Sequence, residues 1–253
     1  VIAMRPDKGK STMCAQIEAF AAPQIDKLFP DEKRSILHFN NEGPGKRLVT
    51  RIFQAAIGEN GSTIEELVAL ANTPSKDAKY KTAVREEYAK ALGGRMGVIR
   101  VMDIHGLWNY EVEDLIRLYN PALIVFDMVD NIKFGGEANN NGQRTDQLLE
   151  AMYQWARFMG VKYDTAVIAN SQVSADGDGL QYPTLPMLKD SKTGKQGAAD
   201  VILVGGAVND PMLANSRYWS CTKNKKVRTG QISSPNVELL LIVDRARYIE
   251  API

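Results

Sequence analysis

The sequence VIAMRPDKGKST (residues 1–12) decides the fold that this chain is predicted to adopt. Residues 1–3 are the end of an apolar strand, and residues 11–22 have the pattern of a helix. The N–H groups at the start of a helix point toward a bound anion, and the helix dipole favours negative charge there. A strand, a turn and a helix in this order are typical of a phosphate-binding loop. We therefore expect nucleotide phosphates to contact Arg5, Pro6, Asp7, Lys8, Gly9, Lys10, Ser11 and Thr12.

Two side chains of this loop have specific predicted roles. Lys10 would reach the β- and γ-phosphates, and the Ser11 hydroxyl would hold Mg²⁺. Met4 stands where the general pattern has Gly, but a glycine is needed there only if the backbone adopts a positive φ. We therefore expect the loop to function with Met4. The alternative is a chance Gly-Lys-Ser sequence in an ordinary turn.

Strands alternate with helices along the rest of the chain, which is typical of a mostly parallel sheet with helices on both faces. Residues 122–127 (ALIVFD) form an unbroken apolar run, which indicates a strand buried on both faces. Other strands are expected at 35–39, 97–102, 165–170 and 201–204, and helices at about 44–57, 62–92, 110–119 and 145–160. Residues 133–143 and 175–197 are expected to be loops, and strands at 218–222 and 237–243 to form a C-terminal antiparallel hairpin. The sequence contains no repeat and no linker, so it predicts one α/β domain.

Proteins with a parallel sheet bind their ligands at the carboxyl ends of the strands. Three polar residues lie at or just after the ends of predicted strands. Asp127 closes the strand at 122–127 and suits the carboxylate that orients Mg²⁺. Glu42 would orient or deprotonate the attacking water, and the alternative is a partner of the helix dipole or a cap. Gln172 would sense the γ-phosphate, and the alternative is a simple hydrogen bond at the strand end.

Composition excludes several classes of protein. The 253 residues are 44% hydrophobic and 24% charged, as in globular proteins, so a disordered or fibrous chain is excluded. The net charge of +1 means that an anionic partner would have to be bound by local basic clusters. Two distant cysteines and two histidines argue against a metal cluster and indicate a reducing cytoplasm. No apolar run approaches the roughly 20 residues of a membrane span, and no charged and apolar leader begins at Val1, so we expect no signal peptide. Because the chain begins inside a strand, we expect it to be a piece of a longer protein.

The ordered motifs resemble those of the RecA-type motor domain of DnaB-like replicative DNA helicases, in a divergent, phage-like form. VIAMRPDKGKST is similar to the phosphate loop of that family, and ILHFNNEGP (36–44) to its glutamate motif. LIVFDMVDNI (123–132) resembles its Walker B strand, and VIANSQVS (167–174) its strand ending in Ser-Gln. LPMLKDSKTGKQGAADVILV (185–204) is similar to its loop that contacts single-stranded DNA. The resemblance extends over essentially the whole chain.

The resemblance implies a RecA-like P-loop NTPase fold that uses ATP and Mg²⁺. It makes Glu42 the catalytic glutamate, Asp127 the Walker B aspartate and Gln172 the sensor glutamine. It also implies a hexameric ring that moves 5′→3′ on single-stranded DNA. The residues expected to contact that DNA are Lys189, Ser191, Lys192, Lys195, Lys133 and Arg144.

Two matching segments depart from the family pattern. The DNA-contact loop has Lys189-Asp190-Ser191-Lys192 where the family has Arg-Glu-Ser-Gly, so a bidentate phosphate contact becomes a point charge. In the basic hairpin the family has a Lys and, two residues later, an Arg that acts as a finger in the neighbouring subunit. Lys223 and Lys225 stand at these positions, and Arg228 is an alternative finger. A solvated basic turn is the alternative for the whole cluster.

Several other residues that could carry chemistry are more simply explained by packing. We expect core, interface or surface positions, and no catalytic role, for Cys14, His38, His105, Trp108, Tyr110 and Trp155. Tyr248, beyond the last predicted strand, is a weaker candidate to pack on adenine.

The sequence therefore favours an ATP-dependent replicative DNA helicase motor, cytoplasmic and without a membrane partner. The alternatives are a RecA/RadA-like recombinase or recombination mediator, and a KaiC-like ATPase scaffold with no DNA role. We expect an N-terminal part outside this sequence, for which the alternatives are a primase, a loader-binding domain and a linker helix; a primase or a loader would be a partner through this region.

Overall fold

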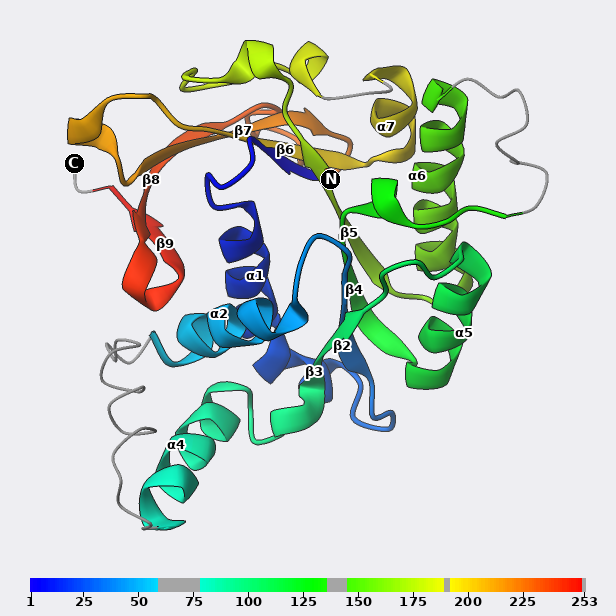
Figure 1. The fold of residues 1–253 in the computed structure, drawn as a ribbon, viewed down its shortest axis with the longest axis vertical. Coiled ribbons are helices and arrows are strands. Elements are labelled where there is room, and N and C mark those ends of the chain that lie inside the picture. Colours follow the sequence, from blue (N-terminus) through cyan, green and yellow to red (C-terminus); the bar gives the residue numbers. More distant parts are fainter. Residues whose placement is uncertain (59–77, 136–144, 189–191, 252–253) are drawn as a thin grey trace.

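The computed structural model describes residues 1–58, 78–135, 145–188 and 192–251. Within these ranges nine strands form one sheet, in the order β3-β2-β4-β5-β1-β6-β7-β8-β9 (Figure 1). The first six strands in the chain run parallel to one another, and the last three add antiparallel pairs at one side. The predicted α/β fold, a mostly parallel sheet with a C-terminal antiparallel hairpin, is confirmed.

The parallel strands are β1 (Ile2–Met4), β2 (Ser35–Asn40), β3 (Ile99–Asp103), β4 (Pro121–Asp127), β5 (Ala166–Gln172) and β6 (Val201–Gly206). The antiparallel strands are β7 (Ser216–Asn224), β8 (Asn236–Ile242) and β9 (Arg247–Glu250). The helices are α1 (Lys10–Leu28), α2 (Gly45–Ile57), α4 (Ala78–Ala91), α5 (Asn109–Tyr119), α6 (Thr145–Lys162) and α7 (Lys192–Ala198).

Two hydrophobic cores cover the two faces of the parallel strands. Leu123 and Val125 of β4 pack with α1 and α2, whereas Ile124 and Phe126 pack with α5 and α6 on the opposite face. Figure 1 shows these helix pairs on the two sides of the sheet. Successive residues of a strand point to opposite faces, so a strand buried on both faces must be apolar at every position. This is why the unbroken run at 122–127 lies at the centre of the sheet.

The strand register brings four distant parts of the chain to one edge of the sheet. Met4 at the end of β1 lies beside Gln172 at the end of β5, and Asn40 at the end of β2 lies beside Asp127 at the end of β4. The phosphate loop, the Glu42 loop and the Asp127 strand end therefore meet at the carboxyl edge, where parallel sheets bind ligands.

Several element boundaries differ from the sequence expectation. Helix α1 continues through Pro23 to Leu28, because Ala22 and Ile25 keep its buried face in contact with the sheet. The expected loop at 175–197 contains α7, which packs on α6. Strand β9 has no counterpart in the sequence expectation, and it forms because Arg247 and Tyr248 are buried against the rest of the fold. None of the helices in the described ranges is long and apolar enough to cross a bilayer.

Candidate active site

The phosphate loop joins β1 to α1 through two residues with left-handed backbone. Gly9 has φ 116° and precedes the helix, and Asp7 has φ 57°. Met4 lies in β1 without a positive φ, so the position where the general pattern has Gly needs no glycine here. The turn is instead made at Asp7 and Gly9. A side chain at Gly9 would also collide with the Tyr248 hydroxyl, because a Cβ built there lies 2.2 Å from that oxygen.

Two side chains from the C-terminal strands hold the carbonyl groups of this loop. Arg217 Nε donates a hydrogen bond to the Lys8 carbonyl at 2.6 Å, and the Tyr248 hydroxyl donates to the Gly9 carbonyl at 3.1 Å. Arg217 is buried, and it also donates to the backbone carbonyls of Ala214 and Ser216. These contacts fix the loop from behind. Tyr248 packs against Trp219 and is buried, so its expected role against adenine is wrong.

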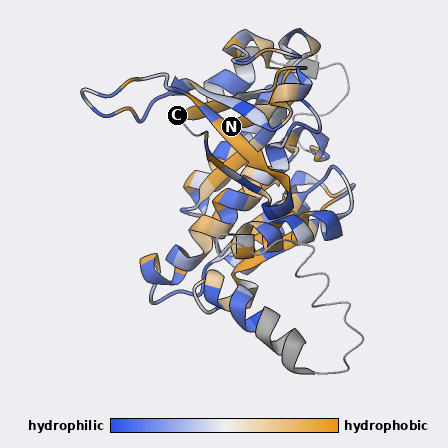
Figure 2. Ribbon diagram, turned by 90° about the vertical axis from the view of Figure 1, so that its left-hand side faces the viewer, coloured by the Kyte–Doolittle hydropathy of each residue, from blue (hydrophilic) through white to orange (hydrophobic). Residues whose placement is uncertain are grey.

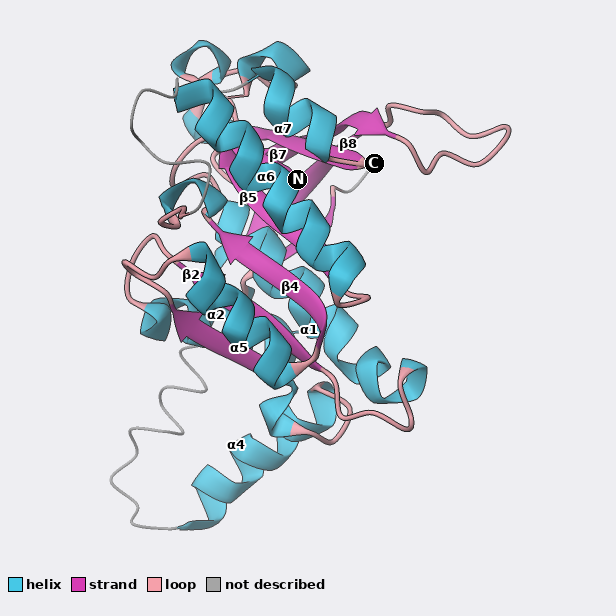
Figure 3. Cartoon of the chain, turned by 90° about the vertical axis from the view of Figure 1, so that its right-hand side faces the viewer, coloured by secondary structure: helices cyan, strands magenta, loops and turns pink. Residues whose placement is uncertain are grey.

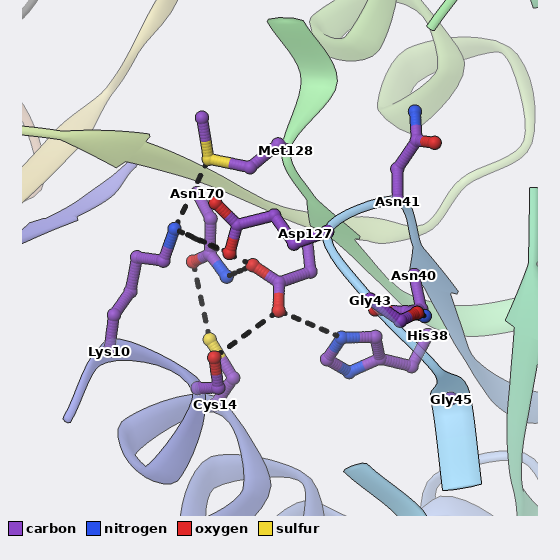
Figure 4. Close-up of polar contacts among 12 residues, drawn as sticks. Lys10, Cys14, His38, Asn40, Asn41, Gly43, Gly45, Asp127, Met128 and Asn170 are labelled. Atoms are coloured by element: carbon purple, nitrogen blue, oxygen red, sulfur yellow. Dashed lines mark hydrogen bonds and ion pairs between the residues drawn. The ribbon is translucent and has the colours of Figure 1, made fainter. Parts of the chain in front are cut away.

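Asp127 is the centre of the polar site, and it is only 3% exposed (Figure 4). The Lys10 ammonium lies 3.6 Å from its carboxylate, the Ser11 hydroxyl 3.3 Å, and the Asn170 amide donates to it at 2.7 Å. Asn170 in turn accepts a hydrogen bond from the Cys14 thiol at 3.2 Å. Burial raises the pKa of that thiol far above its ordinary range, so Cys14 is a protonated donor in the core and not a nucleophile.

A second buried pair lies behind Asp127. His38 on β2 and Glu18 on α1 are fully buried, and His38 Nδ1 contacts the Glu18 carboxylate at 2.5 Å. The Nε2 atom of His38 faces Asp127 at 3.9 Å (Figure 4). Burial alone would lower the pKa of His38, but the two carboxylates raise it to about 9.

The same environment keeps Asp127 ionised. Burial alone would raise the pKa of its carboxyl group. The facing His38 ring, the Lys10 ammonium and the Asn170 amide outweigh that effect and hold the pKa well below its ordinary value. A fully ionised carboxylate next to a hydroxyl oxygen is a hard donor set of the kind that Mg²⁺ prefers.

Glu42 and Gln172 complete the ring of polar side chains around Lys10. The Glu42 carboxylate lies 3.4 Å from the Lys10 ammonium and accepts a hydrogen bond from the Gln172 amide at 3.3 Å. Helix α2 begins at Gly45 with Pro44 as its N-cap and has no side-chain cap. Glu42 is therefore not the cap of this helix, and its carboxylate faces the phosphate-loop lysine.

The loop that carries Glu42 is held by neighbouring strand ends. The Asp103 carboxylate at the end of β3 accepts hydrogen bonds from the Asn40 amide at 2.5 Å and from the Gly45 N–H at 3.0 Å. A Cβ at Gly45 would lie 2.6 Å from the Asp103 carboxylate, so a larger residue there would force that carboxylate to shift. His105 contacts the Gly43 carbonyl at 3.1 Å from an exposed position, which agrees with its expected surface role.

A cavity of about 590 Å³ opens over the phosphate loop, Glu42 and Gln172, and its walls are completed by Arg51 and Gln54 of α2 with Leu241 and Val243. Its size and its cationic, N–H-rich floor fit a nucleoside triphosphate. The Ser11 hydroxyl and the Asp127 carboxylate fit Mg²⁺, which takes few protein oxygens and completes its shell with phosphate and water.

The basic hairpin lies at the opposite edge of the sheet. Lys223 pairs with Ile202 near the start of β6, and its ammonium contacts the Gln196 carbonyl. Lys225 lies 3.8 Å from the Asp200 carboxylate, and its side chain is about half exposed. Arg228 is exposed in the loop between β7 and β8, which projects from the body of the protein in Figures 2 and 3. None of these three residues lines the cavity at Lys10 of its own chain.

The residues expected to contact DNA have different outcomes. Lys195 is fully buried, and its ammonium lies 2.9 Å from Asp130 and 3.1 Å from the Ser171 hydroxyl. The prediction for Lys195 is therefore wrong, because a buried and ion-paired ammonium cannot reach a DNA phosphate. Lys133 is exposed. Arg144, Lys189, Ser191 and the side chain of Lys192 lie outside the described residues.

Sequence reasoning missed three residues that support the site from behind, Glu18, Asn170 and Arg217, and it missed Arg51, which lines the cavity. A signal was present for the first of them. Glu18 follows Cys14 by four residues and so lies on the same face of α1, and His38 interrupts the apolar strand ILHF. Two ionisable residues at core positions must be paired to be tolerated, which could have predicted their contact. No comparable pattern marks Arg217, because its contact with Lys8 spans 209 residues.

The fold is similar to that of two solved structures. The first, described as an ATPase domain, matches with a TM-score of 0.70 and 16% identity, covering 99% of this chain and 84% of that chain. The second, a DnaB-like replicative helicase studied with its interactions with primase, matches with a TM-score of 0.69 and 15% identity. That match covers 99% of this chain and 57% of the helicase chain. No family model and no curated protein matches the sequence. The chain thus has a DnaB-like RecA-type fold, as the sequence resemblance predicts.

The buried His38 makes folding stability dependent on pH. The pKa of His38 is about 9 in the fold and about 6.5 in an unfolded chain, so the folded state binds this proton more tightly. Its contribution is complete below about pH 6.5 and is lost as the pH rises to about 9. We expect the free energy of unfolding of the metal-free and nucleotide-free protein to fall by up to about 3 kcal/mol over this interval.

Urea unfolding at a series of pH values measures this effect. Glu18→Gln removes the nearest carboxylate with little change of shape, so its unfolding free energy should vary much less between pH 6.5 and 9. Glu113→Gln is a matched control, because this carboxylate pairs with Lys162 on the other side of the protein. A Glu18→Gln profile as steep as that of the wild type would contradict the assignment of the His38 pKa.

Proposed function

We propose that this protein is an ATP-hydrolysing helicase motor that moves along single-stranded DNA. The observation that carries the proposal is the convergence of Lys10, Ser11, Glu42, Asp127 and Gln172 at one edge of a DnaB-like fold. A phosphate loop, a carboxylate for Mg²⁺ and a second carboxylate for water are the parts that nucleotide hydrolysis requires. The similarity to a replicative helicase supports the further step from hydrolysis to movement on DNA.

Binding of ATP would use the floor and walls of the 590 Å³ cavity. The N–H groups at the start of α1 and the Lys10 ammonium would bind the phosphates, exchanging the lysine's present contacts with Glu42 and Asp127 for phosphate oxygens. Ser11 and Asp127 would hold Mg²⁺, which when bound neutralises charge on the phosphates. Arg217 and Tyr248 would keep the loop backbone in place during this exchange.

Hydrolysis would then use Glu42 as the base. Its side chain is one-third exposed, so water can reach it, and it faces the phosphate-loop lysine. The Gln172 amide holds one Glu42 oxygen and would move with it when a γ-phosphate is present or absent. This linkage connects the state of the nucleotide to β5 and to the segment that follows it, where the sequence predicts DNA contacts.

A neighbouring subunit would complete the site. Lys223 pairs with Ile202, four residues before the end of β6, which is roughly 13 Å along the strand from the carboxyl edge. Lys225 lies farther from that edge, since its N–H donates to the Asp200 carbonyl just before β6 begins. This separation supports a role at another chain's nucleotide and not at their own. A cation at the developing phosphoryl charge lowers the barrier without taking part in bond formation. This arrangement supports an assembly of several subunits, for which we propose a hexameric ring.

The proposal is tested by strand displacement and DNA-stimulated ATPase assays on the full chain, with Lys10→Ala and Glu42→Gln as variants. Lys10→Ala should lose ATP binding, because the main cation facing the phosphates is gone. Glu42→Gln should keep ATP binding and lose turnover and unwinding, since only the base is removed. If the wild-type protein hydrolyses ATP without stimulation by DNA and displaces no strand, it is not a helicase motor. If the Glu42→Gln variant hydrolyses ATP at the wild-type rate, Glu42 is not the base.

The DNA contacts are tested by the salt dependence of single-strand binding. Changing Lys189 and Lys192 to Ala should weaken binding and reduce the slope of log K against log salt by about 0.7 for each lost phosphate contact. Replacing the exposed Lys90, on α4, by Ala serves as a control for the loss of a surface charge. An unchanged slope in the double variant would show that these lysines do not contact the DNA backbone.

The trans-acting lysine is tested by mixing variants. Lys225→Ala should still bind ATP but lose on the order of 10² to 10³ in rate, the typical cost of removing one donor at the developing charge. Adding an excess of Glu42→Gln subunits should restore part of the activity, because a Lys225→Ala subunit keeps its own base and borrows a cation from its neighbour. If mixed assemblies form and remain inactive, Lys225 does not act in trans. Mixing Arg228→Ala with Glu42→Gln subunits in the same way then tests whether Arg228 acts in trans.

A further inference from the structure

A pair of aromatic rings is exposed at the start of α5, outside the nucleotide site. Trp108 is 38% exposed and Tyr110 is 55% exposed, and their rings are stacked with centroids 6.1 Å apart and planes inclined by only 11°. Large aromatic side chains are normally packed in a core or against a partner. Trp155 is half-buried and Trp219 is buried, so Trp108 is the most exposed tryptophan of the chain.

The stack is held rigidly by the segment that follows β4. The Asn109 N–H donates to the Lys133 carbonyl at 2.8 Å, the Lys133 N–H donates to the Leu107 carbonyl at 3.1 Å, and the Gly135 N–H donates to the Asn109 side chain at 3.0 Å. Gly135 lies against the edges of both rings, since a Cβ built there would be 3.3 Å from Trp108 and 3.6 Å from Tyr110. The rings therefore form a fixed platform that loses little conformational entropy on binding.

The charge beside the platform is positive. The Lys133 ammonium lies 5.9 Å from the centre of the Trp108 ring, and no carboxylate in the described ranges forms an ion pair with it. The nearby Glu111 carboxylate accepts a hydrogen bond from the backbone N–H of Trp108 at 2.7 Å, so one of the carboxylate oxygens is already bound. A cavity of about 440 Å³ opens beside the platform, and both Trp108 and Lys133 line it.

We infer that Trp108, Tyr110 and Lys133 form a binding site for one nucleotide of single-stranded DNA, an inference that rests on the proposed function. A base would stack on the exposed Tyr110 ring and extend the existing pair, and the Lys133 ammonium would contact a phosphate. Stacking on aromatic rings is tolerant of sequence because every base has a flat π face, which suits a motor that must pass along any strand. The exposed cation favours a polyanion over an apolar protein surface as the partner.

The inference is tested by comparing two oligonucleotides of equal length, one of thymidine and one of abasic sites. Both carry the same phosphates, so they differ only in the bases. For the wild-type full chain we expect tighter binding of the thymidine strand. Tyr110→Ala should weaken that binding on the order of 10-fold, within the range measured for one stacked base, and leave abasic binding unchanged. The salt slope should not change, since no phosphate contact is removed.

Matched variants separate stacking from a loss of folding. Tyr110→Phe keeps the ring and should bind both strands as the wild type does, and Leu118→Ala, at an exposed position on the same helix, should do so too. Binding of the thymidine strand should also quench the fluorescence of Trp108, and Trp108→Phe should lose that quenching while keeping its affinity.

Each contrary result has a distinct meaning. A wild-type chain that binds neither strand contradicts the proposed function itself. A wild type that binds both strands equally, or a Tyr110→Ala variant with unchanged binding, overturns the stacking step while leaving the motor proposal intact. A Tyr110→Ala variant that loses its assembly in native mass spectrometry would identify the platform as a contact between subunits and would also overturn the inference.

Discussion

The ionised carboxylate of Asp127 is the constraint on which the rest of the site depends. It is buried at the end of a central strand, where an isolated charge would be strongly disfavoured. Lys10, Asn170 and the His38–Glu18 pair make the charge tolerable, and they come from β2, β5 and α1. The hydrophobic core holds these elements together, and the register of β2, β4 and β5 brings His38 and Asn170 within reach of the carboxylate. The same negative charge then suits the Mg²⁺ that ATP brings.

The topology of the sheet separates the two halves of the proposed chemistry. Parallel strands place the phosphate loop, Glu42 and Asp127 at one edge, whereas the antiparallel turn back from β6 to β7 returns the chain to the other edge and places Lys223 and Lys225 there. The N-terminal end of β7 has the opposite role, since its Arg217 holds the phosphate loop of its own chain. Strand β7 thus contacts the phosphate loop through its first residues and carries the basic residues at its last. Under the proposed mechanism, this strand would link the nucleotide site of its own chain to the nucleotide site of the neighbouring subunit.

Much of the fold was predictable because its strongest signals are local. The apolar run 122–127, the strand–turn–helix at 1–12 and the Glu after the strand at 35–39 each indicate position and role from a few neighbouring residues. The structure brings Lys10, Ser11, Glu42, Asp127 and Gln172 together as expected. Sequence reasoning failed where contacts are long-range. Lys195 looks like a basic loop residue, yet it lies on α7, and its ammonium is buried against Asp130 and Ser171 of β5. Strand β9 and the Arg217 contact were missed for the same reason.

Each chain has its own phosphate loop and both carboxylates, but under the proposed mechanism it still needs a cation from a second subunit to hydrolyse ATP. The most direct measurement is the ATPase rate per protein chain over a wide range of protein concentration, with the state of assembly followed in the same samples. We expect a low rate for the dilute monomer and a rate per chain that rises as assemblies form. A monomer that hydrolyses ATP as fast, per chain, as the assembled protein would contradict the proposed mechanism.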